Sequence, residues 1–350
     1  MYVIYARNVH EALPLMLHHL QMHGVRNESR YGNVVVAPTP VTTVYEKPHE
    51  RVLFWGERDI NPFFHLFEAL WMLAGRNDVA WLAYYNKRMA EFSDDGETFH
   101  GAYGHRWRKH FLFDQLDTVV KLLTNKPNSR RAVIQMFDAH VDLREDETQK
   151  DIPCNTIITV WKHGNRLDMT VFCRSNDIIW GAAGTNAVHF AILQEYLAAR
   201  IGLRPGELYQ ISNNFHAYEK VFEDTLPVAR RYSRSRWQPY TRPQGNTYSP
   251  VPIVTYPNEF DEDLETFMAG QWLPSQTWTN PFFPEVAVPM HQAFQIFREG
   301  GDSIERFRAI QGILGNAAVD CAICKNPDWL HAAMQWMERR EKKAIEAKEQ

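Results

Sequence analysis

A cysteine at the start of an apolar run is the first residue of this chain that could do chemistry. Cys154 lies in Pro153-Cys154-Asn155, directly before a segment that favours a β-strand. A thiolate is a strong nucleophile, but a thiol is mostly protonated at neutral pH and needs nearby positive charge to ionise. Without such a partner, a cysteine in this place is a small buried hydrophobic side chain. The choice between these interpretations depends on which cations the fold brings to Cys154.

Two arginine clusters could supply that charge. Arg174 and Ser175 follow an apolar run, and a guanidinium can bind a phosphate through two parallel hydrogen bonds. The alternative for Arg174 is an ion pair with an aspartate at the end of a strand. Arg130 and Arg131 precede another short apolar run, where two adjacent arginines are in most proteins a solvated surface. Taken alone, these clusters leave both a phosphate site and a surface role open.

The segments around these clusters predict an α+β fold. Apolar runs favour β-strands, two of them joined as a hairpin by the turn 163–165, at residues 34–36, 41–45, 132–137, 156–162, 166–172 and 207–212. Helical spacing and helix-end signals favour helices at residues 8–23, 62–73, 79–92, 113–123, 187–200 and 304–350. Residues 24–33 are expected to form a polar loop. Residues 232–289, rich in Pro, Tyr, Trp and Thr, are expected to form loops and short strands.

The composition is that of a folded protein with a large core. The chain has 350 residues, of which 45% are hydrophobic and 23% are charged. A formal net charge of −4 argues against stable nucleic-acid binding. Four cysteines are too few for a disulfide framework, and no run of about 18 apolar residues is present to span a membrane. We therefore expect a cytoplasmic protein with no metal and no membrane partner.

The order of several motifs resembles the thymidylate synthase superfamily. The matching stretches lie within residues 3–221, in the family's order: Ser29-Arg30-Tyr31-Gly32, residues 68–73, residues 103–108, Arg130-Arg131, Pro153-Cys154-Asn155, Arg174-Ser175-Asn176-Asp177, residues 181–186 and His216-Ala217-Tyr218. The resemblance implies a thymidylate synthase-like α+β fold, with a mixed β-sheet, surrounding helices and a homodimer formed through the sheet. It implies one domain over residues 1–350, with 1–221 as the matched core and 222–350 as a divergent Pro- and aromatic-rich segment with a C-terminal helical extension.

The resemblance also implies a covalent one-carbon transfer. Cys154 would add to carbon 6 of a pyrimidine nucleoside monophosphate, and carbon 5 would then attack the methylene of 5,10-methylenetetrahydrofolate, the co-substrate. Glu68 would transfer protons to and from the base through ordered water. Asn186 would hydrogen-bond to the edge of the base, and Asp177 would contact the folate pterin. The plainer alternatives are a carboxylate on a helix face for Glu68 and a helix N-cap for Asn186.

The same resemblance implies that two chains share each active site. The substrate phosphate would be bound by Arg30, Arg174 and Ser175 of one chain and by Arg130 and Arg131 of the other. The sugar 3′-hydroxyl would be bound by His216 and Tyr218. A homodimer with shared sites is therefore the expected assembly.

Several departures from the synthases lie on the folate side or beside the base. Asn155 stands where the synthases have a His after the catalytic Cys. Residues 181–186 form a loop one residue longer than theirs and lack its Phe, and residues 87–92 lack the Trp of a stretch that lines the folate site. The chain also continues into a helix where the synthases have a short tail that closes over folate. With an altered folate wall, water can reach the exocyclic methylene on carbon 5, and the product is then a 5-hydroxymethyl nucleotide.

Three functions are consistent with this pattern. A pyrimidine nucleotide hydroxymethylase is favoured, because residues 181–190 look more like that branch, which occurs in DNA viruses; the location would then be the host cytoplasm. A divergent thymidylate synthase would share the first half of the mechanism. A non-catalytic regulator that binds nucleotide or RNA is disfavoured by the presence of Cys154, Glu68 and the arginines. Asn186 favours uracil, because an amide offers both a donor and an acceptor, but cytosine stays open.

Overall fold

The computed structural model describes residues 1–144, 149–235, 238–241, 247–270, 275–300 and 303–349. The chain divides into two compact units, Met1–Arg51 with Glu68–Trp237 and Val52–Phe67 with Gln238–Gln350. All the site residues predicted from the sequence lie in the first unit. The organisation as one domain stays a prediction.

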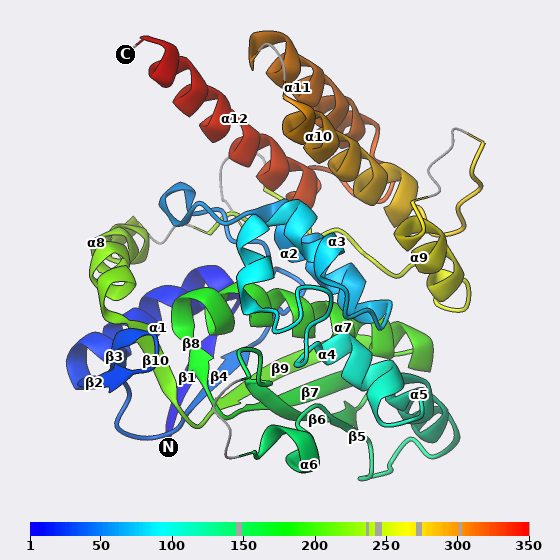
Figure 1. Cartoon of the computed structure of the whole chain (residues 1–350). Coiled ribbons are helices and arrows are strands. Elements are labelled where there is room, and N and C mark those ends of the chain that lie inside the picture. The colour runs from blue at the N-terminus through cyan, green and yellow to red at the C-terminus, as the bar shows by residue number, and fades with distance from the viewer. Residues whose placement is uncertain (145–148, 236–237, 242–246, 271–274, 301–302, 350) are drawn as a thin grey trace. The chain divides into compact units, whose positions relative to one another are not determined.

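A mixed six-stranded sheet forms the centre of the first unit (Figure 1). Its strands lie in the order β1 (Tyr2–Ala6), β4 (Val41–Tyr45), β9 (Arg204–Ser212), β7 (Arg166–Cys173), β6 (Asn155–His163) and β5 (Val133–Gln135). β6 and β7 form the predicted antiparallel hairpin, whereas β7 pairs with β9, and β1 with β4, in parallel. The predicted mixed sheet of an α+β fold is confirmed.

Helices cover one face of this sheet and leave the other half-exposed. α7 (Asn186–Ile201) packs on β7 and β9, with α5 (Gln115–Asn125) against it, and α1 (Val9–His23) packs on β1. Because α7 is covered on several sides, its sequence is apolar nearly all round. On the opposite face the exposed fractions of Val3, Tyr5, Val133 and Trp161 are 42%, 66%, 39% and 44%. Exposed apolar side chains gathered on one sheet face are typical of a surface that packs against a partner.

A second sheet lies beside the first and carries part of the site. Its order is β2 (Val25–Ser29), β3 (Gly32–Val36), β10 (Phe215–Tyr218) and β8 (Asn176–Asp177). The prediction of a polar loop over residues 24–33 is wrong, because β2 pairs antiparallel with β3. All five side chains of β2 are exposed. An edge strand of this kind has no buried face and therefore lacks the apolar alternation that marks a strand in a sequence.

Short helices connect these layers. They are α2 (Pro62–Leu73), α3 (Val79–Tyr85), η2 (Lys87–Phe92), α4 (Tyr103–His105), η3 (Arg106–His110), α6 (Ala139–Asp142), η4 (Ile178–Thr185) and α8 (Glu219–Ser235). The single helix predicted over residues 79–92 is broken at Asn86. This residue is extended, and its side chain accepts a hydrogen bond from the Arg88 N–H and so starts a new helical segment.

The second unit is mainly helical. It contains η1 (Gly56–Arg58), α9 (Phe260–Met268), η5 (Phe283–Ala287), α10 (Val288–Glu299), α11 (Ser303–Asp320) and α12 (Asp328–Glu349). The prediction of loops and short strands over residues 232–289 is wrong for α9 and η5. Asp263 of α9 accepts hydrogen bonds from the backbone of Thr279 and Asn280, and Phe260, Phe267 and Phe283 pack together. Among the described residues no helix has the length and hydropathy to cross a membrane.

Candidate active site

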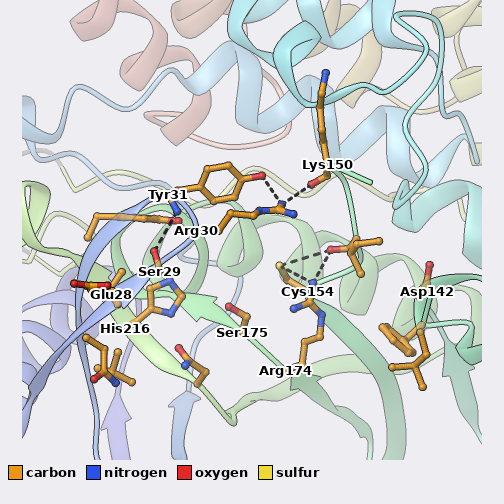
Figure 2. A pocket seen from close by; sticks show the side chains of 18 residues that line it. Glu28, Ser29, Arg30, Tyr31, Asp142, Lys150, Cys154, Arg174, Ser175 and His216 are labelled. Carbon is orange, nitrogen blue, oxygen red and sulfur yellow. Dashed lines mark hydrogen bonds between the residues drawn. The ribbon is translucent and has the colours of Figure 1, made fainter. Parts of the chain in front are cut away.

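A cavity of about 570 Å³ lies in the first unit, and we call it the cationic cavity (Figure 2). Its charged lining consists of the cationic side chains of Arg30, Lys150 and Arg174 and the carboxylates of Glu28 and Asp142. Ser29 and Ser175 add hydroxyl groups, and the predicted residues Cys154, His216 and Tyr218 complete the polar part of the wall. Guanidinium and ammonium groups with hydroxyl donors are the groups that bind a phosphate. The cavity therefore suits a ligand that carries an anionic group.

Backbone contacts fix the position of Cys154 at the edge of this cavity. The Tyr103 hydroxyl accepts hydrogen bonds from the N–H groups of Cys154, at 3.1 Å, and of Asn155, at 3.2 Å. Tyr103 reaches this place because α4 packs tightly on α2. A Cβ on Gly104 would lie 2.0 Å from the Met72 carbonyl oxygen, so only glycine allows this approach. Tyr103 and Gly104 belong to a motif that the sequence singled out without assigning either residue a role.

The Cys154 thiol lies beside the Arg174 guanidinium. Arg174 Nη2 is 3.9 Å from Cys154 Sγ, and its other hydrogen bonds, to the carbonyl oxygens of Ile152 and Pro153, hold the guanidinium there. Burial raises the pKa of Cys154, Arg174 opposes this rise, and Asp151 adds to it. The thiol is therefore protonated at neutral pH in the free protein, and Arg174 is the group that favours the thiolate.

The turn between β2 and β3 brings Arg30 to the other side of the cavity. The Arg30 guanidinium stacks over the Tyr31 ring at 4.6 Å and donates to the Tyr31 hydroxyl. It also donates to the carbonyl oxygens of Gln149 and Lys150, each at 3.4 Å. These contacts join the turn to the segment that leads into Cys154, as Figure 2 shows. Arg30 and Arg174 thus approach one cavity from two different sheets.

A second cavity, of about 200 Å³, contains the predicted Glu68 and Asn186, and we call it the acidic cavity. Its polar lining also includes Asp151, Thr185 and His189. The remaining wall is mostly apolar and aromatic, and it is made by Trp71, Met72, Leu82, Met89, Phe92, Phe99 and Tyr103. Tyr103 binds the backbone of Cys154, so the acidic cavity lies next to the nucleophile. A carboxylate between apolar walls can accept and donate protons at a bound ligand while the walls exclude bulk water.

A chain of buried amides connects Asn186 to the strands behind Cys154. The Asn186 side chain accepts from Asn155 at 3.2 Å and donates to Asn176 at 3.1 Å. Asn155 in turn accepts from the Cys173 thiol at 2.8 Å. A Cβ on Gly181 would lie 2.6 Å from Asn176 Oδ1 and 3.1 Å from Asn186 Nδ2. The altered loop at residues 181–186 therefore makes room for the pair Asn176–Asn186.

The structure brings most of the predicted site residues together. Six of them line the cationic cavity: Arg30, Cys154, Arg174, Ser175, His216 and Tyr218. Glu68 and Asn186 line the acidic cavity. Asp177 lines neither, and its carboxylate accepts hydrogen bonds from the N–H groups of Ile179 and Trp180 at the start of η4. Arg130 and Arg131 are exposed before β5 and line neither cavity of their own chain. The roles of all these residues stay predictions.

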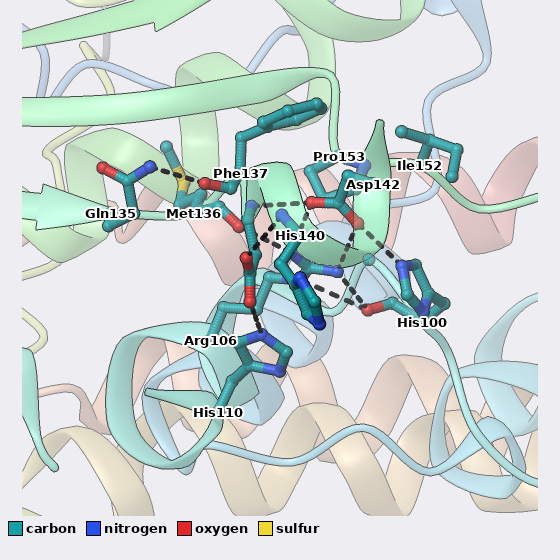
Figure 3. Close-up of polar contacts among 12 residues, drawn as sticks. His100, Arg106, His110, Gln135, Met136, Phe137, His140, Asp142, Ile152 and Pro153 are labelled. Atoms are coloured by element: carbon teal, nitrogen blue, oxygen red, sulfur yellow. Dashed lines mark hydrogen bonds and ion pairs between the residues drawn. The ribbon is translucent and has the colours of Figure 1, made fainter. Parts of the chain in front are cut away.

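A buried ion pair supports the wall of the cationic cavity that contains Asp142 (Figure 3). Arg106 donates to both oxygens of the Asp142 carboxylate, at 2.7 and 2.9 Å, and its remaining N–H groups donate to the carbonyl oxygens of Met136 and His100. The His100 ring also contacts Asp142, at 2.7 Å. Burial alone would raise the pKa of Asp142, but hydrogen bonds from Arg106, the Asp138 N–H and His100 bring it below its usual range. The carboxylate is therefore ionised and fully paired.

A half-buried thiol beside a guanidinium, at the edge of a cavity that also contains Arg30 and Lys150, is an arrangement typical of enzymes that act on anionic substrates. Residues 15–244 match the sequence model of the family described as Thymidylate synthase. Because this match covers well over half of the chain, the chain belongs to the thymidylate synthase family. The predicted resemblance is confirmed.

Individual relatives extend the similarity beyond these residues. A deoxyuridylate hydroxymethyltransferase of Pseudomonas phage M6 is 45% identical over 99% of this chain and 97% of the relative. A deoxyuridylate hydroxymethyltransferase of Bacillus phage SP01 is 34% identical over 65% of this chain and 63% of the relative. A thymidylate synthase of Corynebacterium aurimucosum is 28% identical over 57% of this chain and 73% of the relative. The similarity to the M6 protein therefore includes the second unit, where the sequence motifs fade.

The exchange Arg106→Gln tests the buried pair. The exposed fractions of the Arg106 and Asp142 side chains are 1% and 0%, so the exchange leaves a buried carboxylate without its counter-charge. We expect a loss of about 3–5 kcal/mol in the free energy of unfolding, measured by urea denaturation. The control is Arg76→Gln, which breaks the half-exposed pair with Asp78 and should cost about 1 kcal/mol or less. Equal losses in the two variants would contradict the importance of burial.

The exchange Arg174→Gln tests the charge beside the thiol. Loss of the guanidinium should raise the pKa of Cys154 further, so alkylation of Cys154 by iodoacetamide at pH 8 should slow by about tenfold, because less thiolate is present. Peptide mass spectrometry measures the rate at each cysteine. Cys321 is the internal control, because hydrogen bonds from Cys324 and the backbone lower its pKa to about 7. An unchanged Cys154 rate, or an equal change at Cys321, would refute the electrostatic link.

Proposed function

We propose that this protein transfers a one-carbon unit from 5,10-methylenetetrahydrofolate to carbon 5 of deoxyuridine monophosphate and releases the 5-hydroxymethyl nucleotide. The observation that carries the proposal is the Cys154 thiol, which lies 3.9 Å from the Arg174 guanidinium and lines the cationic cavity. Its backbone N–H donates to Tyr103, which lines the acidic cavity. The names of the M6 and SP01 relatives support the hydroxymethyl product and the uracil base.

The cationic cavity would bind the nucleotide by its phosphate and sugar. Arg30 and Arg174, which approach from two sheets, would bracket the phosphate, with the Ser175 hydroxyl as a further donor. His216 and Tyr218 lie on β10 with ring centroids 5.8 Å apart, and both line this cavity, where they would bind the sugar hydroxyl. Binding the phosphate far from carbon 6 orients the base for attack.

The acidic cavity would hold the base edge and the reacting carbon. The thiol of Cys154 would add to carbon 6, and Arg174 would stabilise the thiolate that attacks. Asn186 would bind the uracil edge through the donor and the acceptor of its amide, whose orientation the buried amide chain fixes. Glu68 would hold and release protons at the base. Of these side chains, Asn186 and Glu68 line the acidic cavity, whereas Cys154 and Arg174 line the cationic cavity.

The residues of the acidic cavity fit a planar heteroaromatic co-substrate. Trp71, Phe92 and Phe99 offer aromatic surface beside Glu68, and methylenetetrahydrofolate would supply a carbon at the oxidation level of formaldehyde. Asp177 is proposed to contact the pterin. Segment 87–92 forms η2 and contributes Met89 and Phe92, but no Trp, to the cavity. This supports release of a hydroxymethyl rather than a methyl product.

The assembly proposed for these sites is a homodimer. The open face of the six-stranded sheet exposes Tyr5 and Trp161, which supports a partner packed on that face. Arg130 and Arg131 are exposed and outside the cavities of their own chain, as expected of residues that serve the partner's phosphate. The phage origin of the M6 and SP01 relatives supports a location in the host cytoplasm, and the net charge of −4 supports the absence of stable nucleic-acid binding.

A reaction in oxygen-18 water tests the proposed product. We expect the label in the hydroxyl of 5-hydroxymethyl deoxyuridine monophosphate by mass spectrometry, with no rise in dihydrofolate absorbance. Turnover of deoxycytidine monophosphate should be about 100-fold slower or more, because an amide oriented for uracil leaves a polar mismatch with cytosine.

The control for this reaction is Cys154→Ser. It should abolish product formation from either nucleotide. Nucleotide affinity should stay within about tenfold of the native value, because the phosphate contacts are intact. A methyl product with dihydrofolate would make the protein a thymidylate synthase. Failure of the native protein to turn over either nucleotide would make it a binding protein.

Mixing two inactive variants tests the shared site. If Arg130 serves the partner, a heterodimer of Arg130→Ala and Cys154→Ala has one intact and one doubly altered site. Random exchange should then restore about one quarter of the native activity. The matched control mixes Arg174→Ala with Cys154→Ala, which act on the same site and should restore nothing. Equal recovery in both mixtures, or none in the first after proven subunit exchange, would refute the shared site.

A further inference from the structure

His189 was not among the residues predicted from the sequence, yet it faces Glu68 inside the acidic cavity. Glu68 lies on α2 and His189 on α7, and His189 Nε2 is 3.1 Å from Glu68 Oε2. His189 follows Asn186 by three residues, which places both on one side of α7. Both line the cavity beside Cys154. The acidic cavity is thus lined by the ring nitrogen of His189, the carboxylate of Glu68 and the amide of Asn186, the residue proposed to bind the uracil edge.

The contact between the two residues is not a closed structural pair. The exposed fractions of the His189 and Glu68 side chains are 4% and 14%. Despite the short distance, neither His189 Nε2 nor Glu68 Oε2 makes a hydrogen bond of good geometry with the residues that the structure describes. Buried polar atoms are almost always hydrogen-bonded in folded proteins, so we infer that these two atoms bind a polar ligand or a water molecule in the cavity. A cavity of about 200 Å³ has room for a water molecule between them and the base.

We propose that Glu68 and His189 activate the water that converts the exocyclic methylene on carbon 5 into a hydroxymethyl group. This inference rests on the proposed function. The water oxygen bonds to the methylene carbon while its proton passes to the Glu68–His189 pair. The electrons of the exocyclic double bond move into the ring, carbon 6 expels the Cys154 sulfur, and the carbon 5–carbon 6 double bond forms again. No electron is gained or lost overall, so the step needs no oxidant or reductant.

The other titratable groups of the cavity are less suited to this step. Asp151 Oδ2 already accepts the Gly101 N–H at 2.8 Å. The Tyr103 hydroxyl is occupied by two backbone N–H groups, and burial raises the pKa of Tyr103 above its usual range. His189 Nε2, in contrast, makes no hydrogen bond of good geometry with the residues that the structure describes, so it is the nitrogen placed to accept a proton from a water molecule. His189 is therefore the residue that distinguishes this cavity as a site for water attack.

The exchange His189→Gln separates the water step from the steps before it. Gln keeps a polar amide near the position of Nε2 but cannot accept the proton. In a single turnover, with the protein in excess over deoxyuridine monophosphate tritiated at carbon 5, release of tritium reports the steps up to loss of the carbon 5 proton, and mass spectrometry reports the hydroxymethyl product. We expect tritium release within about threefold of the native rate and product formation slowed by about 100-fold or more, the usual contribution of a general base. The covalent nucleotide adduct on Cys154 should accumulate on denaturing mass spectrometry.

Two further measurements exclude a merely structural role. His19→Gln removes another buried imidazole of the same unit, on α1 and stacked on Tyr2, and should leave the ratio of tritium release to product unchanged. Nucleotide affinity without folate, measured by calorimetry, should be unchanged in His189→Gln. In His189→Ala, added imidazole should restore product formation more than tritium release.

The outcomes distinguish this inference from the proposed function. If the native protein forms no hydroxymethyl product, the proposed function fails and the inference falls with it. If the native protein forms the product and His189→Gln lowers tritium release and product equally, the proposed function stands and His189 has no part in activating water. The same conclusion follows if imidazole does not restore the ratio in His189→Ala.

Discussion

The buried amide chain behind Cys154 is the constraint on which the geometry of the site depends. It runs from the Cys173 thiol through Asn155 and Asn186 to Asn176, with links of 2.8–3.2 Å. These residues belong to β7, β6, α7 and β8, so the chain fixes the start of the α7 helix relative to both sheets. A buried network rigidifies a protein when each member is hydrogen-bonded. The substitution of Asn for His after the catalytic cysteine is therefore part of the scaffold, because Asn155 is the link between thiol and amide.

Charge is divided between the cavity that Cys154 lines and the cavity lined by Tyr103, which binds the Cys154 backbone. The cationic cavity has Arg30, Lys150 and Arg174, whereas the acidic cavity has Glu68 and Asp151 between aromatic walls. Burial and Asp151 oppose ionisation of the Cys154 thiol, and Arg174 favours it. These opposing effects leave the thiol protonated in the free protein. With charge separated in this way, the substrate phosphate would bind in the cationic cavity, and proton transfer to and from the base would take place in the acidic cavity.

The departures from the synthases have a common location. Asn155, Gly181 and the segment η2 all contact or line the region around Asn186 and the acidic cavity. The cationic cavity, in contrast, is built from the motifs that match the family. In the proposed function, a change confined to the acidic side would keep nucleotide binding and covalent activation, and would alter what happens to the methylene afterwards. This pattern agrees with family membership combined with strong similarity to phage hydroxymethyltransferases.

The sequence alone determined the family, the α+β class and the β6–β7 hairpin. It also singled out six residues that line the cationic cavity, because these features depend on local periodicity and on short motifs in a fixed order. It did not reveal the exposed strand β2 or the helix α9, whose formation depends on pairing with β3 and on contacts with residues 279–283. It also did not reveal that His189 faces Glu68. No local pattern records that contact, because two residues far apart in the chain meet only when α2 and α7 pack together. The tertiary structure decided which polar groups share a cavity, and therefore which of them can act on the same atoms.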